Sequence, residues 1–246
     1  MSDAGLSPAA GSRGNALIVA HGQPSDPGPA AADLAALAVR VAALLPGWEV
    51  QSATLAEGDG FAAVARGMAP GLIYPMFMAG GWFTRVQIPQ RLAVAGIAGW
   101  TVLEPFGCDP ALHDLVVTLV AEAAVQEVIL AAHGSFKSSV PSDVARHVAA
   151  RIAAEVPIAR AVPAYIDQSP QLATTTGFGP GSLCLPFFAA MGGHVTDDIP
   201  KALTEAGFQG RILPPVGLDH RVPALIAAAI LRGQPVCADR CRWQRG

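Results

Sequence analysis

Two histidines and one aspartate have the side-chain types needed for metal or proton chemistry. His133 follows the apolar run VILAA, His194 ends the segment AAMGGH, and Asp167 lies within AYIDQSP. Two imidazoles and a carboxylate suit borderline divalent ions such as Fe²⁺, Co²⁺ and Ni²⁺. A neutral imidazole also accepts a proton near neutral pH. A fold that gathers these three side chains could therefore hold a divalent metal ion and take up protons.

The elements around these residues must place them at one edge of a sheet. Short β-rich runs alternate with longer alanine-rich stretches, which is the pattern of a parallel sheet with helices on both faces. Ligands of such sheets bind beyond the carboxyl ends of the strands, where the strand order reverses. With a flavodoxin-like order 2-1-3-4, His133, Asp167 and His194 follow the first, second and third strands of the second half. All three then face one crevice.

The chain repeats itself once. The segment ALIVAHGQPSD (16–26) matches VILAAHGSFKS (128–138), which pairs His21 with His133 at an offset of 112 residues. A Gly-Gly-Trp motif in the first half matches Gly-Gly-His in the second half at the same offset, and a third, weaker match follows near the end of each half. Three collinear matches predict two copies of one domain.

The first copy has lost most of the candidate site. His21 remains, but the alignment places Trp82 at the position of His194, and Ala56 or Glu57 near the position of Asp167. An indole nitrogen only donates hydrogen bonds and cannot ligate a metal. We therefore expect one active site, in the second half, with the first half forming the opposite wall of a cleft.

The predicted organisation is a flexible leader, two copies of one domain, and a tail. The boundaries are 1–14 for the leader, 15–123 for the N-terminal domain with the degenerate site, 124–233 for the C-terminal domain with the active site, and 234–246 for the tail. Strands are expected at 16–20, 48–54, 71–76 and 100–103, then at 126–131, 158–163, 182–187 and 210–213. Helices of the second half are expected at 141–154, 169–177, 195–206 and 219–231.

Composition excludes several other classes of protein. Of the 246 residues, 52% are hydrophobic and 14% charged, against about 25% charged in typical domains, so the chain should fold around an ample core. A net charge of −3 with scattered basic residues disfavours nucleic-acid binding. Neither a membrane-spanning run nor a signal peptide is recognisable, and four irregularly spaced cysteines fit a reducing cytoplasm. Nucleotide-binding glycine motifs are lacking, so no nucleotide or redox cofactor is expected.

Three segments resemble the sirohydrochlorin chelatases of the CbiX/SirB type, a family of class II chelatases. They are VILAAHGSF (128–136), AYIDQSP (164–170) and LPFFAAMGGHVTDDIP (185–200). The last is the most specific, since the family has an apolar strand end, then Gly-x-His, then Asp-Ile-Pro. The resemblance covers roughly 15–233 and implies two flavodoxin-like halves that face each other across a tetrapyrrole cleft.

The resemblance also implies insertion of Co²⁺ or Fe²⁺ into sirohydrochlorin, on the route to cobalamin or siroheme. His133 and His194 would be the metal-binding and proton-accepting pair, with Asp167 orienting an imidazole or sharing the metal. At the position of Asp167 the family more often has glutamate, so the carboxylate reaches less far here. The protein would act as a monomer or a homodimer.

Two other functions are compatible with the sequence. One is a carrier that binds a tetrapyrrole or metal without turnover, and the other is a hydrolase or transferase with Ser135 as nucleophile, although the strained elbow of such enzymes is lacking. Lys137, Arg85 and Lys201 are candidate partners for substrate carboxylates. Asp197 and Asp198 are interpreted as favourable charges at a helix start, and Cys237 and Cys241 as part of a disordered or dimer-forming tail.

Overall fold

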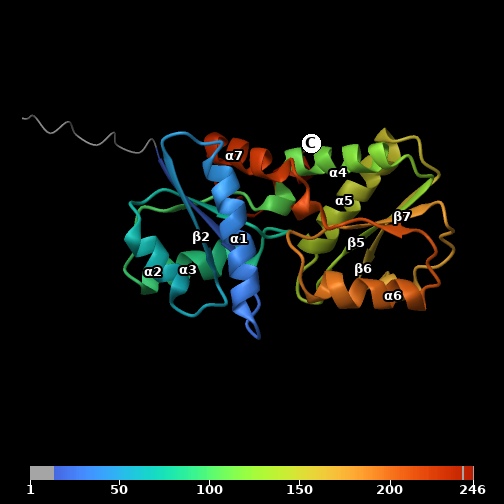
Figure 1. The fold of residues 1–246 in the computed structure, drawn as a ribbon, viewed down its shortest axis with the longest axis horizontal. Coiled ribbons are helices and arrows are strands. Elements are labelled where there is room, and N and C mark those ends of the chain that lie inside the picture. Colours follow the sequence, from blue (N-terminus) through green and yellow to red (C-terminus); the bar gives the residue numbers. More distant parts are fainter. Residues whose placement is uncertain (1–13, 240, 246) are drawn as a thin grey trace, which may run out of the picture.

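Two four-stranded parallel sheets lie side by side along the long axis of the molecule (Figure 1). The computed structural model describes residues 14–239 and 241–245, so most of the predicted leader lies outside the described residues. The strand order is β2-β1-β3-β4 in the first sheet and β6-β5-β7-β8 in the second. Both orders agree with the predicted flavodoxin-like order 2-1-3-4, and the α/β class with two tandem domains is confirmed.

The bounds of the helices and strands follow the predicted rhythm. The first half contains β1 (Gly14–Ala20), α1 (Pro27–Ala42), β2 (Trp48–Thr54), α2 (Gly60–Gly67), β3 (Leu72–Pro75), α3 (Ile88–Val94), β4 (Thr101–Val102) and α4 (Pro110–Ala123). The second half contains β5 (Glu127–Ala132), α5 (Val140–Glu155), β6 (Arg160–Tyr165), β7 (Ser182–Pro186), α6 (Ile199–Glu205), β8 (Arg211–Ile212) and α7 (Val222–Arg232). A π-helical turn precedes α3, at Phe83–Gln87, and another precedes α6, at His194–Asp198.

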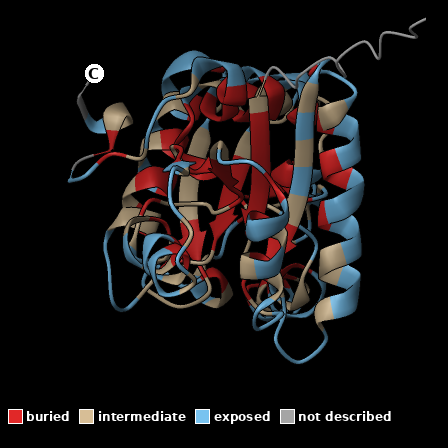
Figure 2. Cartoon of the chain, turned by 90° about the vertical axis from the view of Figure 1, so that its left-hand side faces the viewer, coloured by how far each residue is buried: buried red, intermediate tan, exposed pale blue. Residues whose placement is uncertain are grey.

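The central strands are apolar because helices cover both of their faces. Residues 16–19 of β1 and 128–131 of β5 are fully buried, as expected for inner strands of parallel sheets. Figure 2 shows these buried strands between helices whose outward surfaces are exposed. Packing on both faces fixes the positions of the carboxyl ends of the strands, and therefore the positions at which the following loops begin.

The last helix of each half packs on the other half. Helix α7 lies against α1 and β3 of the first half, whereas α4 lies against α5 of the second half (Figure 1). One hydrophobic core consequently includes side chains from both halves on this side of the sheets, while the opposite faces keep separate cores beneath α2 and α3 and beneath α6. The two halves are joined by a common interior.

In each half, a glycine lets the 3₁₀ turn before the last helix pack closely on the segment that follows the third strand. The amide of Gly107 donates to the carbonyl of Phe77 at 2.9 Å, and that of Gly217 donates to Phe188 at 3.0 Å. A Cβ on Gly107 would lie 2.0 Å from the carbonyl oxygen of Met78, and a Cβ on Gly217 would lie 1.9 Å from that of Ala189. Because no side chain larger than a hydrogen atom fits at these two contacts, both positions require glycine.

Two expectations for the second half and its tail were wrong. The helix predicted at 169–177 is a single 3₁₀ turn at Leu172–Thr174, because three consecutive threonines and the glycines after them disfavour helix. The tail is also more ordered than predicted. Pro235 bridges to Leu103, Arg242–Arg245 form a 3₁₀ turn, and both tail cysteines are buried. In the described part of the chain, the helices are too short or too polar to cross a lipid bilayer.

Helix α4 carries a buried histidine that should make the fold sensitive to acid. His113 is 1% exposed and donates from Nε2 to the carbonyl of Gly107 at 2.9 Å. The pKa of His113 is lowered from 6.5 to about 4, mainly by burial and to a smaller extent by the neighbouring His147 and Arg151. Between pH 6.5 and about pH 4 the folded state therefore binds fewer protons than the unfolded state. The free energy of unfolding is therefore highest above pH 6.5 and declines as the pH falls towards 4.

We predict that His113 costs the protein roughly 2–3 kcal/mol of unfolding free energy between about pH 7.5 and about pH 4.5. Urea denaturation at several pH values measures this loss. In the variant His113→Gln, whose amide can still donate to Gly107 but does not titrate, the loss should be smaller by that amount. Identical pH profiles of the two proteins would show that His113 does not titrate with folding.

Candidate functional site

His133 and His194 meet at the carboxyl edge of the second sheet. Their Nε2 atoms are 3.1 Å apart, and the ring centroids are 4.5 Å apart with the ring planes at 90°. These residues are 61 positions apart in the sequence, and they come together because β5 and β7 are neighbouring strands. The structure thus brings together the two histidines that the sequence singled out.

A backbone carbonyl and two carboxylates lie close to the Nδ1 atoms of these imidazoles. Nδ1–H of His133 donates to the carbonyl of Gly134 at 3.0 Å, with a carboxylate oxygen of Asp167 3.4 Å from the same nitrogen. Nδ1–H of His194 donates to Asp198 Oδ2 at 2.7 Å. Such partners fix the tautomer of a metal-binding histidine and turn its other nitrogen to the ion. Both Nε2 atoms are consequently left to share one proton or one metal ion.

Asp198 is the site residue that sequence reasoning missed. It was interpreted as a charge at the start of a helix, but its carboxylate binds His194 one helical turn away. The spacing of four residues between His194 and Asp198 was the available indication, because side chains at i and i+4 lie on the same face of a helix. The π-helical turn that begins at His194 carries both residues.

Local geometry after β5 explains the position of His133. Gly134 has a φ of +76°, a left-handed conformation in which glycine is favoured. A Cβ there would also come within 2.6 Å of the Gln168 side chain. The amide of Asp167 donates to the carbonyl of His133 at 3.0 Å, and the amide of Ser135 donates to Gln168 Oε1 at 2.7 Å. The loops that carry His133 and Asp167 are thus bound to each other.

In the first half, Phe83 and not Trp82 occupies the position of His194. Phe83 begins the π-helical turn of its half as His194 does in the second. The ring of Phe83 stands edge-on against His21 at 4.8 Å, much as His194 stands against His133. The predicted alignment of Trp82 with His194 is therefore off by one residue. The loss of the second histidine stands, with phenylalanine in its place.

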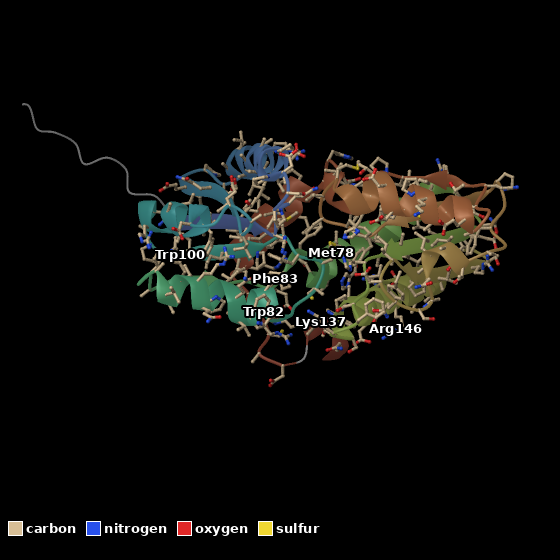
Figure 3. The ribbon with its side chains drawn as sticks, turned by 90° about the horizontal axis from the view of Figure 1, so that it is seen from below. Met78, Trp82, Phe83, Trp100, Lys137 and Arg146 are labelled. Carbon is tan, nitrogen blue, oxygen red and sulfur yellow. The ribbon has the colours of Figure 1, made fainter. Side chains whose placement is uncertain are left out.

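The site opens into a shallow pocket of about 370 Å³. Asp167, His194 and Asp198 line it together with Lys201 and Glu205 of α6. Figure 3, seen from below, shows Lys137 of the second half and Trp82 of the first at the boundary between the halves. Lys137 is exposed. Lys201 and Lys137 can therefore meet an anionic ligand.

Two other candidates have different partners. The guanidinium of Arg85 lies 3.7 Å from the sulfur of Cys241 and so points to the tail rather than to the histidine pair. The hydroxyl oxygen of Ser135 accepts from the amide of Lys137 at 3.1 Å, which is a turn contact of the kind serines commonly make. The hydroxyl thus caps a turn, and a nucleophilic role for Ser135 loses its support.

The chain thus has two flavodoxin-like halves in tandem, with one histidine pair beyond the strand ends of the second half. The model of the CbiX family matches residues 127–232. Over 89% of its length the chain is 45% identical to a solved structure of CbiX, described as the terminal enzyme for biosynthesis of siroheme in denitrifying bacteria, with 98% of that chain covered and a TM-score of 0.81. The chain belongs to the CbiX-type family of sirohydrochlorin chelatases and is a chelatase.

Two more distant structures share the fold. SirB from Bacillus subtilis with Fe³⁺ is 16% identical, with a TM-score of 0.67 over 89% of this chain and 94% of that one. The sirohydrochlorin chelatase SirB from Bacillus subtilis subspecies spizizenii in complex with cobalt is 16% identical, with a TM-score of 0.65 over the same shares. A search of curated protein sequences gave no match.

We predict that Asp198→Ala lowers the rate of metal insertion about 10- to 100-fold, because the imidazole of His194 loses the carboxylate that orients it. The neighbouring Asp197→Ala is the matched control and should keep nearly the full rate. Steady-state assays of metal insertion into a tetrapyrrole measure both. Equal losses in the two variants would mean that the negative charge of this turn matters and the bond to His194 does not.

Proposed function

We propose that this chelatase inserts Co²⁺ or Fe²⁺ into sirohydrochlorin, with His133 and His194 holding the metal substrate. The observation that carries this proposal is the 3.1 Å separation of the two Nε2 atoms. Two nitrogen ligands at about 2.1 Å from one ion, at angles between octahedral and tetrahedral, lie roughly 3.0–3.4 Å apart. The separation of the pair therefore matches that of two nitrogen ligands on one metal ion.

The same nitrogens supply the proton balance of the reaction. Entry of a divalent ion into the macrocycle displaces two pyrrole N–H protons. As the ion leaves the imidazoles, each Nε2 regains a free lone pair and can accept one of these protons. Asp198 stabilises the resulting charge on His194 at 2.7 Å, and Asp167 can do so for His133 from 3.4 Å. Two nitrogens and two nearby carboxylates thus match one metal ion and two protons.

The second half is the working half in this proposal. In the first half Phe83 offers no ligand and its ring packs against His21, while the carboxylate of Glu57 accepts from Thr54 Oγ1 at 2.8 Å. The first half instead forms the opposite wall of the cleft, where Trp82 is 58% exposed and offers an apolar surface to a macrocycle. Lys137 and Lys201 would bind carboxylates of sirohydrochlorin.

The donor types of the site are compatible with several divalent metals. Imidazole and carboxylate accept Fe²⁺, Co²⁺ and Ni²⁺ alike, and the related SirB structures contain Fe³⁺ or cobalt. We propose siroheme or cobalamin synthesis as the pathway, in line with the CbiX structure that is 45% identical. We also propose that the protein works in the cytoplasm as a monomer or homodimer, in line with its four free cysteines.

Anaerobic metal insertion tests this proposal. Purified protein is incubated with sirohydrochlorin and either Co²⁺ or Fe²⁺, and the absorption of the free base is followed. We expect catalytic loss of the free-base spectrum in the wild type and a rate at least about 100-fold lower in His194→Ala, since a direct ligand is removed. His21→Ala, which lacks the equivalent histidine of the first half, should keep a substantial part of the rate.

The other outcomes are equally informative. Equal losses in His194→Ala and His21→Ala would overturn the assignment of the working half. Tight binding of sirohydrochlorin without any metal insertion would identify a carrier. The relative rates with Co²⁺ and Fe²⁺ decide which metal the enzyme prefers.

A further inference from the structure

A second group of metal-binding side chains lies in the first half, apart from the histidine site. Glu104 follows β4, Cys108 ends a 3₁₀ turn before α4, and Cys241 comes from the C-terminal tail. One ligand atom of each lies within 4.8 Å of those of the other two. We call these three residues the thiol cluster. Cys108 is fully buried and Cys241 is 2% exposed.

The separation of the two sulfurs suits a shared metal ion. Sγ of Cys108 lies 3.8 Å from Sγ of Cys241. In a disulfide the sulfurs are about 2.05 Å apart, whereas two thiolates bound to one tetrahedral zinc at about 2.3 Å lie roughly 3.8 Å apart. The sulfurs thus already have the spacing of a tetrahedral thiolate site.

Glu104 offers an oxygen to complete this group. Its Oε2 accepts a charge-assisted hydrogen bond from Arg242, while Oε1 has the thiol of Cys237 at 3.4 Å. A weak S–H donor is easily replaced at Oε1. The set would be two thiolates and one carboxylate, a donor set that favours Zn²⁺.

The charges around the cluster remain balanced when such an ion binds. Without metal, the carboxylate of Glu104 lies beside the guanidinium of Arg242, and Arg85 lies 3.7 Å from the sulfur of Cys241. One divalent ion that replaces the two thiol protons of Cys108 and Cys241 leaves the net charge of the cluster unchanged. The protons pass to solvent. Burial of the ion therefore adds no uncompensated charge, which would be costly in this interior.

The surroundings of the cluster support binding. The amide of Gly80 donates to the sulfur of Cys108 at 3.3 Å, the type of contact that stabilises a metal-bound thiolate. A cavity of about 190 Å³ lies on the Glu104 side of the cluster, lined by Glu104 and Arg242. Gly80 begins the loop that carries Trp82 and Phe83, so an ion here would tie the tail to that loop.

We propose that Glu104, Cys108 and Cys241 form a structural site for a soft divalent metal, with Zn²⁺ as the best-matched ion, that anchors the C-terminal tail to the first half. This site is separate from the histidine pair in both position and ligand type. It holds its ion permanently, whereas the histidine site passes its metal on. The proposal therefore stands or falls independently of the chelatase mechanism.

Cobalt alone, added to the reduced full-length protein after chelator treatment, tests the ligand set. A thiolate site gives sulfur-to-cobalt charge-transfer absorption and the visible bands of tetrahedral Co²⁺, while the imidazole and carboxylate ligands of the other site give no sulfur band. We expect the sulfur band in wild type, His194→Ala and Cys184→Ala, and its loss in Cys108→Ala and Cys241→Ala. Cys184 is the matched control because it is a buried thiol of the second half.

Zinc content and thiol counts complete the test. Wild type should retain one Zn²⁺ per chain after gel filtration and show a higher melting temperature with the ion than without it. The Cys241→Ala variant should bind Zn²⁺ about 100-fold more weakly or worse. Absence of the sulfur band in the reduced, folded wild type would overturn the proposal. So would a Cys108–Cys241 disulfide, seen as two missing thiols, in protein isolated without oxidant.

Discussion

The common apolar core between the two halves is the constraint on which the rest of the structure depends. Helices α7 and α4 each leave their own half and pack on the other, and side chains such as Val116, Val120, Ile226 and Ile230 are almost completely buried there. Each side chain of this kind contributes about 1.5–3 kcal/mol when buried. Separating the halves would expose all of them at once. The core therefore makes a rigid base from which the loops at the strand ends project.

On this base, duplication has kept the backbone of the site and changed its chemistry in one copy. Both halves use the loop after the first strand and a π-helical turn after the third to bring two rings edge to face. In the second half the rings are imidazoles supported by Asp167 and Asp198, and in the first half they are His21 and Phe83. The same geometry thus gives a ligand pair on one side and an apolar contact on the other. In the proposed function, the ligand pair holds the metal ion and the apolar contact belongs to the wall that faces the macrocycle.

The two proposed metal sites differ in the chemistry of their donors. Imidazoles and carboxylates that are 40–50% exposed at the histidine pair suit an ion that must arrive and leave. Buried thiols and a carboxylate, with arginines around them, suit an ion that stays. The amide of Gly80, in the loop that carries Trp82 and Phe83, donates to the sulfur of Cys108 in the thiol cluster. The position of the C-terminal tail is therefore coupled to the position of this loop.

Much of the fold and the main pair of the site followed from the sequence by itself. The repeated motifs predicted the duplication, and the resemblance implied the flavodoxin-like strand order. With that order His133, Asp167 and His194 converge, because neighbouring parallel strands end at the same edge. The role of Asp198, the match of Phe83 to His194, the exchange of α4 and α7, and the burial of Cys241 against Cys108 were decided only by the tertiary structure. Each depends on which surfaces meet across distant parts of the chain. Helical periodicity shows that α4 and α7 have an apolar face, but it does not show which sheet covers that face. Likewise, the sequence does not show that Cys241 of the tail contacts Cys108, which lies 133 residues earlier in the chain.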